Sequence, residues 1–148
     1  MDSIDEKFMT LALEQASLAF REGEVPVGAV ITLGGELLSA SRNRCISLND
    51  PSAHAEVLAI REAARKLDNY RLIDTTLYVT LEPCIMCAGA IMQARVQRVV
   101  FGADDPKSGG VVSLYRLFQD KRLNHTVEIT GGVERYRSGR NGIDSKSI

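Results

Sequence analysis

The sequence predicts a protein of the α/β class. Two segments rich in apolar and β-branched residues, 76–81 and 96–101, flank a helical segment at 84–94. A strand, a helix of about three turns and a second strand form a βαβ unit, whose strands are expected to be parallel and whose crossover is expected to be right-handed. The 148 residues suffice for one compact core, and 45% of them are hydrophobic and 25% charged, as is usual for globular proteins.

A helix and a β-hairpin are predicted before this unit. Ser3 and Glu6 have the spacing of a capping box, and apolar residues recur at helical intervals as far as Gly23. Residues 25–32 and 36–40 are strand-like, and the Leu-Gly-Gly sequence between them favours a tight connection. These two strands are therefore expected to pair.

The remaining elements follow from the same kind of pattern. The polar segment 42–52 predicts a loop that leads into a helix. The buried stripe of that helix is predicted to comprise Val57, Ile60, Ala64 and Leu67. Residues 113–119 predict one more helix, and residues 126–130 predict one more strand.

Residues that can bind a metal lie at the starts of two predicted helices. His54 and Glu56 begin one helix, and Cys84 and Cys87 begin the other. Cysteines three positions apart share a helix face and can bind one ion, and His54 would add a third ligand. Such a Cys₂His set leaves the fourth tetrahedral position of zinc open, as in catalytic sites, so one zinc per chain is predicted. His125 lies in a polar stretch before a strand and is interpreted as a residue outside the ligand set.

The same residues predict hydrolytic chemistry. A zinc ion and two helix N-termini favour hydroxide over water near neutral pH, which provides a nucleophile without an activated side chain. Hydrolytic replacement of an amine also needs a group that moves protons from this water to the ring nitrogen and to the departing ammonia. We assign that role to Glu56.

The cysteines allow a second interpretation. A Cys-x-x-Cys pair beside a βαβ unit could be a redox dithiol. The conjunction of Cys84 and Cys87 with His54 and Glu56, each at a helix start, favours the metal instead. Cys45 lies in a loop, completes no metal spacing and is interpreted as a free thiol, and three cysteines argue against a disulfide framework.

Charge and hydropathy limit the classes of partner. The net charge of -1 gives no global attraction to nucleic acid, so RNA binding would need a local basic patch. Candidate phosphate contacts are Arg95, Arg98, Lys107, Arg116, Lys121 and Arg122. No apolar run approaches the roughly 18 residues that cross a bilayer, and the first dozen residues do not have the pattern of a secretory signal. We therefore expect a cytoplasmic protein that does not bind membranes.

The pattern His54-x-Glu56 followed by Pro83-Cys84-x-x-Cys87 resembles the signature of the cytidine-deaminase-like superfamily. Within it the chain resembles the tRNA-specific adenosine deaminases, from about residue 8 to residue 133. The segments that carry the resemblance are 24–30, 43–44, 50–56, 80–90 and 98–109, and the last is the most specific. The resemblance implies a three-layer α/β/α fold, with a mixed central sheet of about five strands and helices on both faces.

The resemblance also implies a substrate and its contacts. The reaction would convert the wobble adenosine of a tRNA anticodon loop to inosine, in a homodimer. Asn43 would hydrogen-bond the flipped base, and Val27 would pack on it. Ala55 would also contact the substrate, while Asp105 and Lys107 would contact the flanking nucleotides. A free-base or nucleoside deaminase acting on guanine or cytosine uses the same zinc chemistry and is the alternative, followed by a non-catalytic RNA-binding module.

The sequence divides into a zinc deaminase domain at 1–133 and a tail at 134–148. The family usually has a long amphipathic helix at the position of this tail. Here the tail contains glycines, serines and an Asn-Gly pair without a helical stripe. It is predicted to be irregular.

Overall fold

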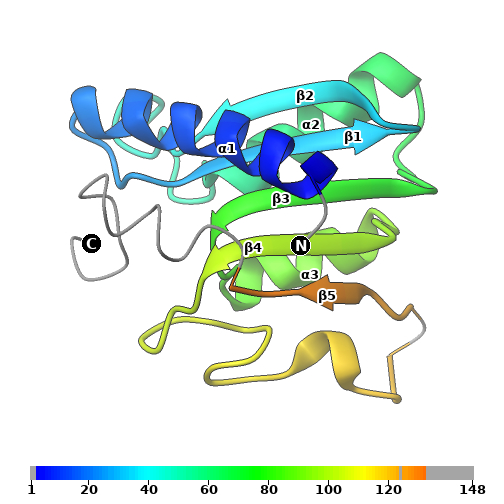
Figure 1. Ribbon diagram of the computed structural model, residues 1–148. Helices are drawn as coiled ribbons and strands as arrows, with labels where there is room; N and C mark the ends of the chain where they lie inside the picture. Colours follow the sequence, from blue (N-terminus) through cyan, green and yellow to red (C-terminus); the bar gives the residue numbers. More distant parts are fainter. Residues whose placement is uncertain (1–2, 124, 133–148) are drawn as a thin grey trace.

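The computed structural model describes residues 3–123 and 125–132, so the predicted irregular tail lies outside the described residues. Its helices are α1 (Ser3–Arg21), α2 (Ala55–Leu67), α3 (Ile85–Gln93) and the 3₁₀ helix η1 (Leu117–Gln119). Its strands are β1 (Gly28–Leu33), β2 (Glu36–Arg42), β3 (Thr75–Leu81), β4 (Arg98–Ala103) and β5 (Glu128–Thr130). Figure 1 shows these elements in the order of the chain.

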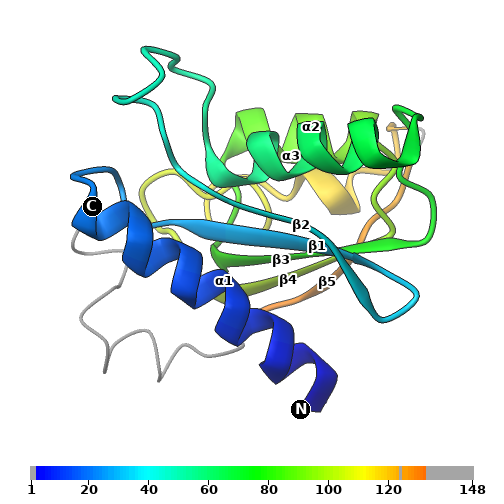
Figure 2. The same ribbon diagram turned by 90° about the horizontal axis from the view of Figure 1, so that it is seen from above.

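The strands form one mixed sheet in the order β2-β1-β3-β4-β5. β1 is antiparallel to β2 and to β3, whereas β4 is parallel to β3 and β5 is parallel to β4. α1 covers one face of the sheet, and α2 and α3 lie side by side on the other face (Figure 2). The predicted hairpin, the parallel βαβ unit and the three-layer α/β/α arrangement are therefore confirmed.

The central strands bury both of their faces, and alternate residues divide between two cores. Ile31 and Val79 pack in the cluster that contains the residues of α2 and α3. Val30, Tyr78 and Val100 pack in the cluster that contains the first turns of α1. This division follows from the two-residue period of a strand, and it explains why these segments are apolar at nearly every position.

α1 lies unusually close to the sheet because β1 begins with a glycine. A Cβ added at Gly28 would lie 2.0 Å from the carbonyl oxygen of Ala12 and 2.6 Å from the amide nitrogen of Ala16. Both alanines are fully buried. The small side chains of α1 and the missing side chain of Gly28 thus let helix and strand backbones meet.

A partly buried ion pair joins the start of α1 to three strands. Both guanidinium NH₂ groups of Arg98 donate to the carboxylate of Asp5, at 3.0 and 2.7 Å. The Tyr78 hydroxyl donates to the same carboxylate at 2.9 Å, and Arg98 also donates to the Thr130 hydroxyl at 3.0 Å. These bonds attach α1 to β3, β4 and β5.

Two predicted features of the helices are wrong. The buried residues of α2 are Ala55, Glu56, Ala59 and Ala63, whereas the predicted stripe of Val57, Ile60, Ala64 and Leu67 is only partly buried. The reason is close packing: small residues face the sheet, and the larger ones pack around the edge of the core. The predicted helix at 113–119 is reduced to turns and η1, because the amides of Leu114, Tyr115 and Leu117 donate to the carbonyl oxygens of Gly109 and Gly110, five to seven residues earlier, and not to carbonyls four residues earlier as in an α-helix.

Some element boundaries also differ from the prediction. The first strand was expected at 25–32, but β1 begins only at Gly28, since Val25 and Pro26 belong to the segment that leads from α1 into the sheet. Within residues 3–123 and 125–132, no helix has the length and apolar character needed to cross a membrane.

Candidate active site

α2 and α3 begin beside each other, at the end of the sheet where β2 and β3 finish. His54 is the N-cap residue of α2, and Cys84 is the N-cap residue of α3. Neither side chain makes a capping hydrogen bond to its own helix. Both are therefore available to a different partner, and Cys87 joins them from the first turn of α3.

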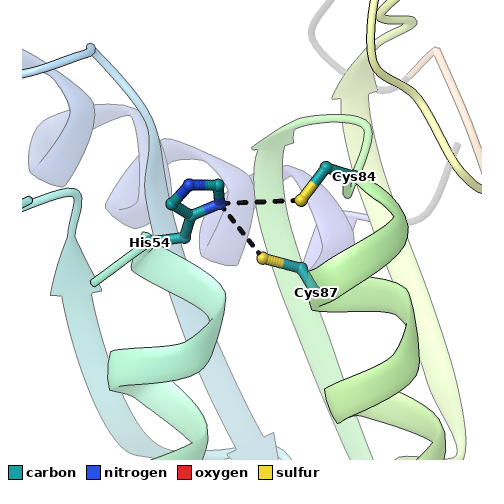
Figure 3. A group of neighbouring side chains, drawn as sticks. All are labelled: His54, Cys84 and Cys87. Carbon is teal, nitrogen blue, oxygen red and sulfur yellow. Dashed lines mark hydrogen bonds between the residues drawn. The ribbon is translucent and has the colours of Figure 1, made fainter. Parts of the chain in front are cut away.

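The three side chains converge as the spacing predicted. The Nδ1 atom of His54 lies 3.6 Å from the Sγ atom of Cys84 and 3.3 Å from that of Cys87 (Figure 3). A nitrogen and a sulfur bound to one tetrahedral zinc ion, at about 2.1 and 2.3 Å, lie about 3.6 Å apart. All three ligand atoms lie within 4.8 Å of one another, so the group can hold a metal ion.

The protonation of the thiols also suits a metal. The pKa of Cys84 is lowered to about 4, chiefly because the Cys87 thiol hydrogen-bonds to it, and His54 adds to this shift. The same hydrogen bond, followed by burial, raises the pKa of Cys87. One thiolate thus exists before any ion binds, and a dication would displace the proton of the other thiol.

Glu56 occupies the second position of α2, next to the ligand group. Its side chain is 4% exposed, and burial raises its pKa from the usual value to about 7. It is not a member of the His54, Cys84 and Cys87 group in the described part of the chain. A carboxyl group with a pKa near neutrality can both accept and release a proton under physiological conditions.

A pocket opens over these residues. Its lining comprises Val25, Val27, Asn43, His54, Glu56, Leu81, Glu82, Cys84, Asp105 and Ser108. It contains three of the four residues to which we assigned zinc chemistry, as well as three of the five expected substrate contacts. The site lies beyond the carboxyl ends of β3 and β4, the usual place for ligands in α/β sheets.

The expected substrate residues differ in their positions. Val27, Asn43 and Asp105 line the pocket. The Oδ1 atom of Asn43 accepts the amide hydrogen of the fully buried Ala55 at 2.7 Å, which leaves the side-chain NH₂ group to meet a ligand. Ala55 therefore contributes by holding Asn43. Lys107 lies on the exposed loop after β4, where its amide donates to Asp105 at 3.1 Å.

His125 and Cys45 lie outside the ligand group, as expected. The Nε2 atom of His125 is 2.8 Å from the carbonyl oxygen of Val96, on a different side of α3. The thiol of Cys45 lies 3.8 Å from the carbonyl oxygen of Pro51, and burial raises its pKa. A raised pKa keeps this thiol protonated and less reactive.

The pattern reasoning missed two buried glutamates that hold the loops around the pocket. The carboxylate of Glu24 accepts the amides of Ile46 and Ser47, at 3.0 and 2.8 Å. Glu82 holds the loop after β4 in the same way and lines the pocket itself. The available signal was weak: Glu24 lies two residues before Pro26, and Glu82 follows an apolar strand and lies immediately before Pro83.

Two of the six candidate phosphate contacts form ion pairs within the chain. Arg98 is held by Asp5, and Arg122 is paired with Asp120. A separate depression between β2 and α2 is lined by four arginines, Arg42, Arg44, Arg61 and Arg65, which the sequence reasoning did not select. Two of the four are ion-paired, with Glu22 and Asp50.

The family model of the MafB19-like deaminases matches residues 3–138. The chain is also 50% identical over 130 residues to the tRNA-specific adenosine deaminase of Haemophilus influenzae, which covers 87% of this chain and 75% of the relative. The chain belongs to the tRNA-specific adenosine deaminases. Among solved structures, a tRNA:A34 deaminase from a study of A-to-I editing at the wobble position superposes with a TM-score of 0.87 at 45% identity, covering 90% of this chain and 97% of that chain.

The tRNA-specific adenosine deaminases share this architecture with free-base enzymes. The guanine deaminase of Bacillus subtilis superposes with a TM-score of 0.67 at 32% identity, covering 95% of both chains. The TM-score and the sequence identity are both lower for the guanine deaminase than for the tRNA:A34 deaminase. This difference agrees with the assignment of the chain to the tRNA-specific adenosine deaminase family.

Proposed function

We propose that this chain is a zinc-dependent hydrolase that converts adenosine to inosine at the wobble position of a tRNA anticodon. The observation that carries the proposal is the convergence of His54, Cys84 and Cys87 beside the buried carboxyl group of Glu56, in a tRNA-specific adenosine deaminase. His54, Glu56 and Cys84 line the pocket above this group. A redox dithiol needs neither the histidine nor the glutamate.

His54, Cys84 and Cys87 would hold one zinc ion per chain. Their donor atoms, one nitrogen and two sulfurs, are those of catalytic zinc sites with three protein ligands. When bound, zinc would supply the nucleophile by lowering the pKa of a water molecule. The N-termini of α2 and α3 point toward the same place, and their partial positive charge favours an anionic oxygen there.

Glu56 would move the protons. Its carboxylate oxygen would accept a proton from the attacking water and deliver it to the ring nitrogen beside the amine. It would then take the second proton from the hydroxyl group added to the ring carbon and give it to the amine, which leaves as ammonia while the carbonyl group forms. A pKa of about 7 balances these two tasks, since the group must be a base at the first step and an acid at the second.

The pocket walls would hold the base. Val27 offers an apolar contact for the ring, and the NH₂ group of Asn43 offers a hydrogen bond to a ring acceptor. A base in an anticodon loop is accessible to a pocket of this kind, because loop bases are unstacked at little cost. Asp105 and Lys107 lie on the adjacent loop, where we propose that they contact the flanking nucleotides.

A second copy of the chain would complete the RNA surface. α3 exposes Ile85 and Met86, at 53% and 39% of their surface, immediately after the ligand Cys84. Apolar side chains of this size at the start of a helix favour coverage by another protein surface. We propose a homodimer that packs through this face, and a cytoplasmic location where tRNA is available.

Inosine formation on an RNA stem-loop tests the proposal. A stem-loop with adenosine at the wobble position, incubated with the zinc-loaded protein, is expected to give inosine in that position only. Guanine, cytosine and cytidine are tested beside it for release of ammonia. Deamination of guanine without conversion of the stem-loop would instead support the free-base alternative, to which the likeness to guanine deaminase points.

A further inference from the structure

Glu82 is a buried carboxylate beside the candidate metal centre that the proposed chemistry does not use. It follows the last residue of β3 and precedes Pro83 and Cys84 in the chain. Only 2% of its surface is exposed. Burial alone would raise the pKa of this carboxyl group, but hydrogen bonds from Ser113 and from backbone amides lower it below its usual value.

Its two oxygens hold both ends of one loop. One oxygen accepts the amide of Asp105 at 3.0 Å and the hydroxyl of Ser113. The other oxygen accepts the amides of Val111, Val112 and Ser113, at 3.0, 2.8 and 3.0 Å. The carboxylate therefore closes the segment 105–113 into a loop around a single charged group.

This loop is a wall of the substrate pocket. Asp105 and Ser108 line the pocket, and so does Glu82. The loop is also joined to the segment between β3 and α3 that contains the metal ligand Cys84, because the Gly110 amide donates to the carbonyl oxygen of Pro83 at 2.8 Å and Cys84 forms a β-bridge with Gly109. The position of the wall and the position of Cys84 are thus coupled.

The fit around the carboxylate is close. A Cβ added at Gly109 would lie 2.3 Å from Oε2 of Glu82 and 2.5 Å from Oε1. A glutamine at position 82 would present an NH₂ donor to amides that are themselves donors, so at least one end of the loop would lose its acceptor. The carboxylate of Glu82 thus occupies its position only because residue 109 has no side chain.

We infer that Glu82 is a positioning residue for the deamination, which sets the wall carrying Asp105 and Ser108 at the correct distance from the metal centre and so orients the substrate base. The inference rests on the proposed function. Misplacement of a bound reactant by about 1 Å can reduce a rate about 10²-fold. Glu82 should therefore affect the chemical step and not only stability.

The test compares Glu82→Gln with wild type and with Glu36→Gln, a matched control at an exposed position in the β1–β2 hairpin. The zinc content is expected to stay near one per chain. Amide hydrogen exchange of residues 105–113 is expected to accelerate at least about tenfold, while exchange in α2 stays unchanged. The single-turnover rate at saturating stem-loop is expected to fall about 10²-fold. Glu36→Gln should match wild type in all three measurements.

Gly109→Ala provides a second variant, which retains the carboxylate but displaces it, and the same loss of rate is expected. If Glu82→Gln does not fold, Gly109→Ala is measured in its place. The inference is overturned if the folded, zinc-loaded variants turn over within about twofold of wild type, or if the exchange of residues 105–113 is unchanged. Failure of the wild type to produce inosine would defeat the proposed function, and the exchange data would then decide the role of Glu82 independently.

Discussion

The side chain of Glu56 shows how burial adapts a common residue to proton transfer. An exposed carboxyl group is ionised at neutral pH and is a poor acid, whereas burial at the start of α2 raises this pKa to about 7. The same burial imposes a cost on the folded state, because a carboxylate loses its hydration.

Glu56→Gln should separate catalysis from folding. We expect the variant to keep its zinc and its thermal stability, since the side chain is not a ligand and the amide avoids the cost of burying a charge. The single-turnover rate of inosine formation should fall at least about 10²-fold. Near-normal turnover would show that another group carries the protons.

Cys87→Ala tests the ligand assignment. Cys87 is fully buried and faces the Nδ1 atom of His54, so its loss removes one of three ligands. Elemental analysis should find little zinc, and the midpoint of thermal unfolding should fall. Cys45→Ala, which changes a thiol outside the ligand group, is the control and should retain about one zinc per chain. A full zinc content in Cys87→Ala would contradict the assignment.

Among the secondary-structure elements, α1 is fixed to the sheet by the Asp5–Arg98 ion pair at its first turn. The hydrogen bond from Arg98 holds the pKa of Asp5 below its usual value. A carboxyl group whose pKa is lower in the folded state stabilises that state when the pH is above the pKa of the unfolded chain. This stabilisation is lost as the pH falls through the pKa of the folded state.

Asp5→Asn should therefore be about 2 kcal/mol less stable than wild type at neutral pH. The difference should shrink between neutral pH and an acidic pH below 3.8, the usual pKa of an aspartate, because the folded-state pKa of Asp5 lies lower still. Urea unfolding at both pH values measures it, and a difference independent of pH would contradict the assignment.

The close approach of α1 to β1 leads to a second prediction at this scale. Gly28→Ala should lower the free energy of unfolding by about 2 kcal/mol, because the added methyl group would overlap backbone atoms of α1 that cannot move independently. Gly89→Ala is the matched control, since an added Cβ there would meet no atom within 4 Å and alanine favours a helix. Equal effects in denaturant unfolding would show that the helix can shift freely.

At the scale of the whole molecule, the metal centre joins the layer of helices to the end of the sheet. Its ligands come from two helices that are connected through β3, so the site forms only when the fold is complete. A ligand that binds only the folded state adds about 4 kcal/mol when it is present at about 1,000 times its dissociation constant.

Removal of zinc by a chelator should therefore lower the thermal midpoint of wild type, and added zinc should restore it. Cys87→Ala, already without metal, should show no further shift with chelator. A wild-type midpoint that does not respond to the chelator would contradict a structural contribution of the ion.

The sequence by itself determined the features that depend on local pattern. The order of most elements, the hairpin, the parallel βαβ unit and the three ligands follow from alternation, helical spacing and residue chemistry within short segments. His54, Cys84 and Cys87 could be placed together because each stands at a helix start, and helix starts on one face of a parallel unit meet at one end of the sheet.

Only the tertiary structure decided the features that depend on distant partners. Which face of α2 is buried was set by close packing of alanines on the sheet, and not by the position of its larger residues. The expected helix at 113–119 was lost because the amides of Leu114, Tyr115 and Leu117 donate to Gly109 and Gly110, in a loop that is held by Glu82, about 30 positions earlier. That loop is fixed by hydrogen bonds to a buried carboxylate from outside the segment, and such a distant partner cannot be seen in a local window of sequence.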